Sequence, residues 1–199
     1  MASSSDGTKL VAVVSGGLIY RSSDSGATWT AQTNSSTARN WQSVASSSDG
    51  TKLVAVVYLG LIYRSSDSGA TWTAQTDSST SPKWYSVASS SNGTKLVAVA
   101  LNSLIYRSSD SGATWTAQTD SSTSRFWYSV ASSSDCTKLV AVGNGLIYRS
   151  SDSGATWTAE TDSTAVPRNW QSVASSSDGT KLVAVASNPN GGIWTFLDG

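Results

Sequence analysis

The residues of this chain whose type and spacing could do chemistry are four aspartates inside an unchanged ten-residue segment. The segment RSSDSGATWT stands at residues 21–30, 64–73, 107–116 and 149–158. It places one carboxylate in each copy, at Asp24, Asp67, Asp110 and Asp152. Paired carboxylates are the acid and the base of glycoside hydrolysis. Because every aspartate has an equivalent in the other copies, no particular pair can be assigned to that reaction.

Other catalytic and metal-binding arrangements lack their usual residues. The chain has no histidine, which removes the commonest general base and the commonest neutral metal ligand. Its one glutamate, Glu160, stands where the other repeats have glutamine. The SSDSG segment has too few oxygen ligands for a calcium loop, and no phosphate-binding glycine loop is present. We therefore predict no enzymatic activity, no metal site and no cofactor.

The single cysteine, Cys136, breaks a pattern of glycines. It replaces the glycine found in the equivalent turns at Gly7, Gly50, Gly93 and Gly179. No intrachain disulfide can form from one cysteine, so we expect a free, exposed thiol that could be reactive. Without histidine it makes no catalytic site, and drift in a redundant repeat is the alternative interpretation.

Charge and hydropathy exclude several classes of partner. The 199 residues contain 13 Lys plus Arg and 13 Asp plus Glu, so no net charge attracts nucleic acid or an anionic membrane. The N-terminal residues lack the pattern of a signal peptide, and no apolar run has membrane-spanning length. As written, the sequence predicts a soluble, cytoplasmic protein, with a secreted origin left open.

The elements that position these residues recur every 43 residues, as the lysines Lys9, Lys52, Lys95, Lys138 and Lys181 show. Each unit predicts four short strands, which in the second unit are WQSVASS, TKLVAVV, LIYRSS and ATWTAQT, from residue 41 to residue 76. Asp-Gly between the first two is a strong hairpin signal. No segment has helical spacing of apolar residues, so we expect almost no helix.

A four-stranded sheet repeated at this period is typical of a propeller blade, because one small sheet cannot bury both of its faces. We predict an all-β, five-bladed β-propeller of four-stranded antiparallel blades with an incomplete terminal blade. It would be a single domain over 1–199, with units of about 1–40, 41–83, 84–126, 127–169 and 170–199. We expect a monomer; the alternative is that two chains complete each other's terminal blades.

The segment SSDSGATW resembles the Asp-box, S-x-D-x-G-x-x-W, also called the bacterial neuraminidase repeat. The wider unit is most similar to the repeats of propellers of the photosystem II assembly-factor and sortilin types. This resemblance implies a structural hairpin between the third and fourth strands, which in sialidases lies away from the catalytic pocket. It assigns structural roles to Asp24, Gly26, Trp29, Asp67, Gly69, Trp72, Asp110, Gly112, Trp115, Asp152, Gly154 and Trp157. Physically, the aspartates would accept backbone N–H bonds, the glycines would take positive φ, and the tryptophans would be buried between sheets.

The repeats differ from one another in two connections, between the second and third strands and between the fourth and first. Both connections are expected on one side of the disc, where loops usually carry function. Candidate ligand-binding residues there are Trp41, Trp84, Trp127, Trp170, Arg39, Arg125 and Arg168, accompanied by Lys83, Phe126 and Tyr58. Aromatic and basic side chains together could form shallow carbohydrate sites with avidity across the ring. The alternative is that the tryptophans are wedges between blades and that the loops have drifted.

Two functions therefore remain from the sequence. The first is a non-catalytic, symmetric scaffold with no specific ligand, built from near-identical blades by recent amplification or deliberate construction. The second is a lectin-like propeller that binds carbohydrate. A sialidase needs three converging arginines and a tyrosine–glutamate nucleophile pair. This chain has a single glutamate, and its repeated arginines would be spread around the ring, so we exclude that activity.

Overall fold

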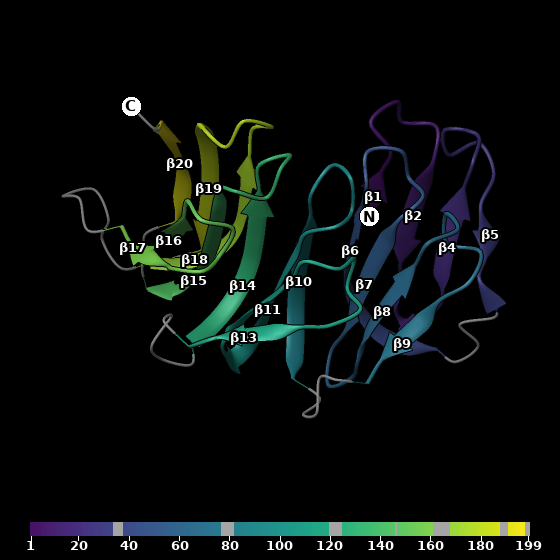
Figure 1. Cartoon of the computed structure of the whole chain (residues 1–199), viewed down its shortest axis with the longest axis horizontal. Helices are drawn as coiled ribbons and strands as arrows, with labels where there is room; N and C mark the ends of the chain where they lie inside the picture. The colour runs from purple at the N-terminus through teal and green to yellow at the C-terminus, as the bar shows by residue number, and fades with distance from the viewer. Residues whose placement is uncertain are drawn as a thin grey trace.

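The computed structural model describes residues 1–33, 38–76, 82–119, 125–145, 147–160, 168–187 and 191–197, and in these ranges only Thr33 and Thr119 have helical (3-10) conformation, so the regular elements are almost all strands. Figure 1 shows them in order from the N-terminal strands at the right to the C-terminal strands at the left. The expectation of a nearly helix-free, all-β chain is confirmed for the described residues.

The strands form five consecutive groups, which we call repeats 1 to 5. Repeat 1 contains β1 (Ala2–Ser3), β2 (Leu10–Val13), β3 (Ser15–Gly17), β4 (Ile19–Ser22) and β5 (Thr30–Ala31). Repeat 2 contains β6 (Arg39–Ser46), β7 (Leu53–Val57), β8 (Ile62–Ser65) and β9 (Thr73–Gln75). Repeat 3 contains β10 (Lys83–Ser89), β11 (Leu96–Ser103), β12 (Ile105–Ser108) and β13 (Thr116–Gln118). Repeat 4 contains β14 (Arg125–Ser132), β15 (Leu139–Gly145), β16 (Ile147–Ser150) and β17 (Thr158–Ala159). Repeat 5 contains β18 (Arg168–Ser175), β19 (Lys181–Ser187) and β20 (Gly192–Leu197).

Within a repeat, each strand pairs antiparallel with the next main strand of the chain, as β6, β7, β8 and β9 do. The strands predicted from the repeat unit and its turn residues are therefore present. The fourth strand is shorter than predicted, because it begins at Thr73 rather than at Ala70. The Asp-box turn continues through Trp72, so the fourth strand begins only after that residue.

Backbone bonds join neighbouring repeats on two sides of the array. On one side, the connection between the second and third strands pairs with the first strand of the following repeat, as Gly17 does with Arg39 and Ser103 with Arg125. On the other side, serine amides and carbonyls form a ladder, in which Ser5, Ser48, Ser91 and Ser134 each donate N–H to the serine 43 positions later, at 2.6–2.7 Å. Most of the chain between the fourth and first strands lies outside the described residues.

The hydrophobic core lies between repeats, because each sheet packs apolar side chains of its two faces against the sheets on either side. One face carries valines and an isoleucine, such as Val97, Val99 and Ile105 of repeat 3, and we call it the valine face. It packs against tryptophan, leucine and alanine of the next repeat, such as Trp127 and Leu139 of repeat 4; we call that side the tryptophan face. The same contact recurs at the other three junctions.

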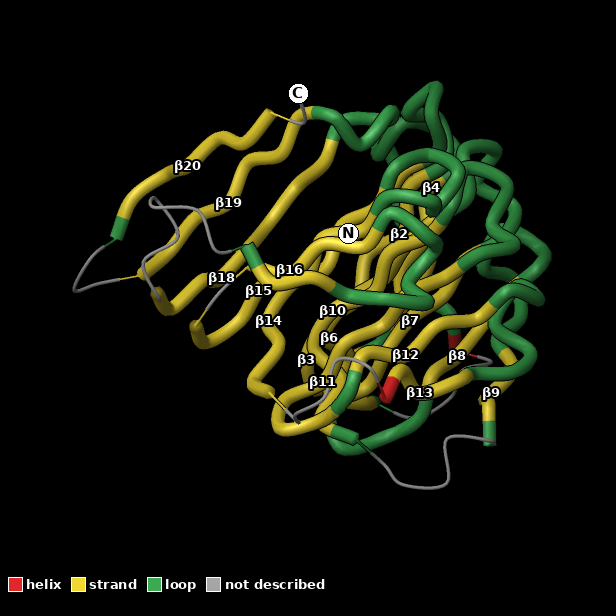
Figure 2. Tube along the Cα trace, turned by 60° about the vertical axis from the view of Figure 1, so that its left-hand side comes forward, coloured by secondary structure: helices red, strands yellow, loops and turns green. Residues whose placement is uncertain are grey.

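The closed ring expected from the sequence is not present among the described strands. β20 pairs with β19 alone, and no strand of repeat 5 pairs with repeat 1. Figure 2 shows β18, β19 and β20 extending away from β2 and β4 of the first repeat. The array therefore ends in two open sheet faces.

Candidate functional site

Each Asp-box is a turn organised by one carboxylate and one serine hydroxyl. In repeat 2, the Ser65 hydroxyl donates to Asp67 Oδ1 at 2.8 Å, and Thr71 donates its N–H to Oδ1 at 2.9 Å and its hydroxyl to Oδ2 at 2.6 Å. Ser65 Oγ in turn accepts the Gly69 N–H at 2.9 Å. The same bonds recur around Asp24, Asp110 and Asp152. Each of these aspartates is therefore bonded within its own turn.

The turn needs two residues in the left-handed region. Gly69 has φ +82°, as expected, and Ser68 before it has φ +57°. Both glycine and serine positions keep this conformation in the other three boxes. The serine was missed, because serine carries no sequence signal for left-handed backbone, which costs a non-glycine residue about 1–2 kcal/mol.

The box tryptophans lie on the tryptophan face, but not all are buried. Trp157 is 8% exposed, and its Nε1 donates to the Gly154 carbonyl at 3.2 Å. Trp72 makes the equivalent bond to Gly69. Trp29 is 40% exposed, because repeat 1 has no repeat before it in the array. The expected burial between sheets is therefore wrong for Trp29.

The hairpin between the first two strands uses the same chemistry. Ser47 Oγ donates to Asp49 Oδ1 at 2.5 Å, and Asp49 Oδ1 accepts the Thr51 N–H at 3.0 Å. In repeat 3, Asn92 replaces this aspartate and accepts the same bonds. The Ser68 N–H donates to the Thr51 carbonyl at 2.9 Å, so hairpin and box form one surface.

These hydrogen bonds keep the carboxylates ionised. The Ser22 hydroxyl, then the Thr28 hydroxyl and N–H, lower the pKa of Asp24 from 3.8 to about 2. Desolvation is the largest influence on Asp110 and raises its pKa, but bonds from Thr114 and Ser108 outweigh it and hold the pKa at about 2. A carboxylate held this far below neutral pH is a poor general acid.

The four tryptophans proposed to bind ligand are inside the protein. Trp41, Trp84, Trp127 and Trp170 are each 0–2% exposed. Trp84 meets the ring of Tyr106 edge to face, with centroids 4.9 Å apart, and the other three have similar aromatic neighbours. Burial leaves no indole face for a sugar to stack on, and all four rings pack in the clusters between neighbouring repeats.

The three arginines proposed with them stack on aromatic rings of their own repeats. Arg39 lies over Tyr63 at 4.9 Å, Arg125 over Tyr148 at 4.8 Å and Arg168 over Trp194 at 4.2 Å from the ring centroid. These cation–π contacts stabilise the first strand against the third. The structure therefore does not bring the seven candidate residues together as an open carbohydrate site.

Cys136 is buried rather than exposed, and the expectation of an accessible thiol is wrong. Its backbone is left-handed, with φ +55°, and 2% of the residue is exposed. The thiol points to the preceding repeat, where Sγ lies 3.6 Å from the Lys95 carbonyl oxygen. Burial raises the pKa of the Cys136 thiol.

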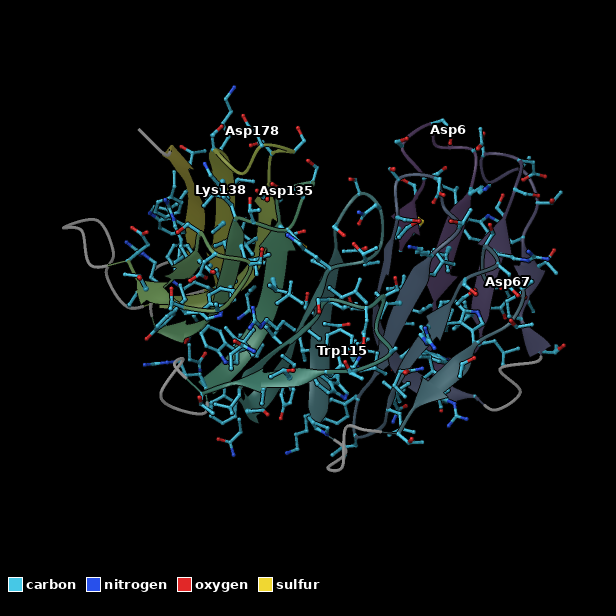
Figure 3. All side chains as sticks on the ribbon, in the orientation of Figure 1. Asp6, Asp67, Trp115, Asp135, Lys138 and Asp178 are labelled. Atoms are coloured by element: carbon cyan, nitrogen blue, oxygen red, sulfur yellow. The ribbon has the colours of Figure 1, made fainter. Side chains whose placement is uncertain are left out.

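Pockets recur at three successive junctions, on the side that carries boxes and hairpins, and leucine side chains line part of two of them. Each is lined by one lysine, one arginine and several serine and threonine hydroxyls. Their volumes are about 340, 290 and 200 Å³. The lysine–arginine pairs are Lys52 with Arg64, Lys95 with Arg107, and Lys138 with Arg149. Figure 3 shows Lys138 and Asp135 near the edge of the molecule that carries Asp178.

The three pockets differ in charge. Arg149 forms an ion pair with Glu160, with 3.0 Å between Nε and Oε1. In the repeat 2–3 pocket, Asp110 is also in the lining, with its carboxylate bonded to Ser108 and Thr114. The lysine and arginine of each pocket belong to the part of the repeat that does not vary along the chain, so variation between repeats gave no reason to select them.

Metal-binding clusters and membrane-spanning helices are also absent from the described residues. No group of three or more His, Cys, Asp or Glu side chains is arranged to hold a metal ion in the part of the chain that the structure describes. No helix among the described residues is long and apolar enough to span a membrane.

Solved structures similar to this one assign it the β-propeller fold. An ancestral GH74 enzyme superposes with TM-score 0.72 at 16% identity, over 97% of this chain and 28% of that protein. YCF48 bound to D1 peptide gives 0.69 at 18% identity, over 97% of this chain and 63% of YCF48. The Swd1 β-propeller domain of Myceliophteria thermophila gives 0.69 at 11% identity, over 96% and 66% of the two chains. The chain thus spans less than two thirds of the first two proteins, and at these identities the likeness establishes the fold alone.

Family comparison is more specific. No curated protein matches the chain. Residues 2–185 match the family described as photosynthesis system II assembly factor YCF48, which agrees with the resemblance found in the Asp-box repeats. That match covers nearly the whole sequence, so the chain belongs to the YCF48 family of photosynthesis system II assembly factors.

Proposed function

We propose that this protein is a non-catalytic scaffold of five blades that binds an acidic segment of a protein partner in the pockets between its repeats. The observation that carries the proposal is the recurrence of one lysine, one arginine and a set of hydroxyls at three successive junctions. A repeated pocket suits an extended chain, which can occupy several equivalent sites at once.

The chemistry of the lining favours carboxylates. Arginine offers a planar fork of donors and lysine a point charge, and hydroxyl groups add further donors. Hydrogen bonds between such cations and carboxylates are about twice as strong as neutral ones. Contacts at successive pockets would raise affinity through effective concentration, without requiring any single pocket to bind tightly.

The known proteins support a protein partner. The chain belongs to a family of assembly factors, and one similar solved structure is YCF48 with a bound D1 peptide. The glycan alternative has no such support, because its proposed tryptophan platforms are buried. The non-catalytic assignment rests on carboxylates that are already held by local hydrogen bonds and on a single glutamate that is paired with Arg149.

Fluorescence anisotropy tests the proposal with a labelled polyglutamate peptide and a polyglutamine peptide of the same length. We expect the acidic peptide to bind, and binding to weaken as salt rises. The double variant Arg64→Gln, Arg107→Gln should weaken it by about tenfold or more. Among the single variants, Arg149→Gln should weaken binding less than Arg107→Gln, because Glu160 already neutralises Arg149. Equal binding of both peptides, or no effect of the double variant, would contradict the proposal.

A further inference from the structure

We infer that the two end faces of the array bind one another between chains, so that the valine face of repeat 5 in one molecule covers the open face of repeat 1 in a second copy. This contact would continue the packing already present at the four internal junctions. It differs from the monomer expected from the sequence.

The valine face of repeat 5 is exposed where its equivalents are buried. Val183 is 37% exposed, whereas the residues at the same position in repeats 2, 3 and 4, Val54, Val97 and Val140, are each 1% exposed. Ile193 is 74% exposed, whereas Ile62, Ile105 and Ile147 are 0–2% exposed. At each internal junction these positions are covered by the tryptophan face of the next repeat.

In repeat 1 it is the tryptophan face that is exposed. Val14 is 47% exposed and its equivalent in repeat 2, Val57, is 6% exposed. Trp29 is 40% exposed and its equivalent in repeat 4, Trp157, is 8% exposed. Val57 and Trp157 both lie on tryptophan faces that the preceding repeat covers. Repeat 1 therefore lacks the cover that a valine face supplies elsewhere.

The serine ladder ends in a matching donor and acceptor. Ser134 donates its N–H to the Ser177 carbonyl at 2.7 Å, but the Ser177 N–H has no partner among the described residues. At the other end, Ser5 donates to Ser48, and no described residue donates to the Ser5 carbonyl. A head-to-tail contact would let Ser177 of one chain donate to Ser5 of the other, as the internal serines do.

A second copy fits as the occupant because its end faces carry the two kinds of surface that pack together at every internal junction, and these faces do not meet within one chain in this structure. Figure 1 places β20 at the left end of the array and the strands of repeat 1 at its right end. A contact between two different patches is heterologous, so it builds a closed ring of chains or a growing filament rather than an isologous dimer.

Analytical ultracentrifugation of the full chain over a range of concentrations tests this inference. Wild-type protein should gain mass as concentration rises. Ile193→Glu and Trp29→Glu should each remain monomeric, because each places a carboxylate in one of the two faces. Phe126→Glu is the matched control: Phe126 is 47% exposed in the middle of the array, and its replacement should leave association unchanged. Val14→Glu replaces Trp29→Glu if that variant does not fold.

Mixing the two monomeric variants gives the decisive result. Each retains one intact face, so the Ile193→Glu and Trp29→Glu chains should form a 1:1 heterodimer that grows no further. A wild-type protein that stays monomeric at every concentration would overturn the inference, whether or not the chain closes on itself. So would a mixture that remains monomeric, since that would indicate an isologous contact.

Discussion

At the scale of single residues, small polar side chains determine the turns of this protein. A serine hydroxyl and a carboxylate or amide oxygen satisfy the backbone of every described box and hairpin. The aspartates and glycines were predictable because their types have known turn preferences. The left-handed backbone of Ser68 was not predictable, because the hydrogen bonds of its neighbours Ser65 and Asp67 impose it.

Acid should destabilise the protein through these aspartates. Their pKa in the folded protein is about 2 at Asp24, Asp67 and Asp152, below the ordinary 3.8. The lowered folded pKa means that their stabilisation is present above pH 4 and is lost as the pH falls from about 4 to about 2. Thermal melts by circular dichroism should show midpoints that fall across this window.

The control for this prediction is Asp67→Asn, which keeps an acceptor oxygen but does not titrate, as Asn92 does naturally in a hairpin. Its melting midpoint should fall less steeply with acid than that of the wild type. Midpoints that do not change between pH 4 and pH 2 would show that these bonds do not distinguish folded from unfolded chains.

Cys136 should react slowly with a thiol reagent in the native protein. The side chain is buried against Lys95 and its pKa is raised, so both access and thiolate formation are reduced. Reaction with DTNB should be complete within the mixing time only in denaturant. Rapid stoichiometric labelling of the folded chain would contradict the buried placement.

At the scale of elements, the exposed fraction of a side chain depends on which repeat carries it. The strands were predictable, because Asp-Gly turns and β-favouring residues are local signals. Exposure was not, because it depends on whether another repeat covers the sheet. Trp29 and Trp157 share a motif position and differ fivefold in exposure, 40% against 8%.

This difference predicts unequal costs for the same substitution. Trp157→Ala should destabilise the protein by about 3–5 kcal/mol, as for other buried tryptophans, because it leaves a cavity between repeats 3 and 4. Trp29→Ala should cost less than about 1 kcal/mol, because solvent already reaches the ring. Urea unfolding measures the free energy of unfolding of both variants. Equal decreases would show that burial at the junction does not determine how much each tryptophan stabilises the fold.

At the scale of the whole molecule, the sequence predicted the repeat and the propeller likeness but not the open array or the location of the pockets. It directed attention to the variable connections, because variation is visible within one chain. Arg39 and Trp41 there proved to be packing residues, whereas the pockets are lined by residues that are the same in each repeat, such as Lys52 and Arg64. Pockets arise only when two sheets meet, so no single repeat encodes them.

An NMR titration of the labelled protein with the polyglutamate peptide tests most directly whether the pockets bind acidic segments. Backbone shifts should change around the pockets, at residues such as Thr71, Ser111 and Ser153. Changes confined to the opposite connections, around Tyr58 and Phe126, or no changes at all, would contradict binding in the pockets.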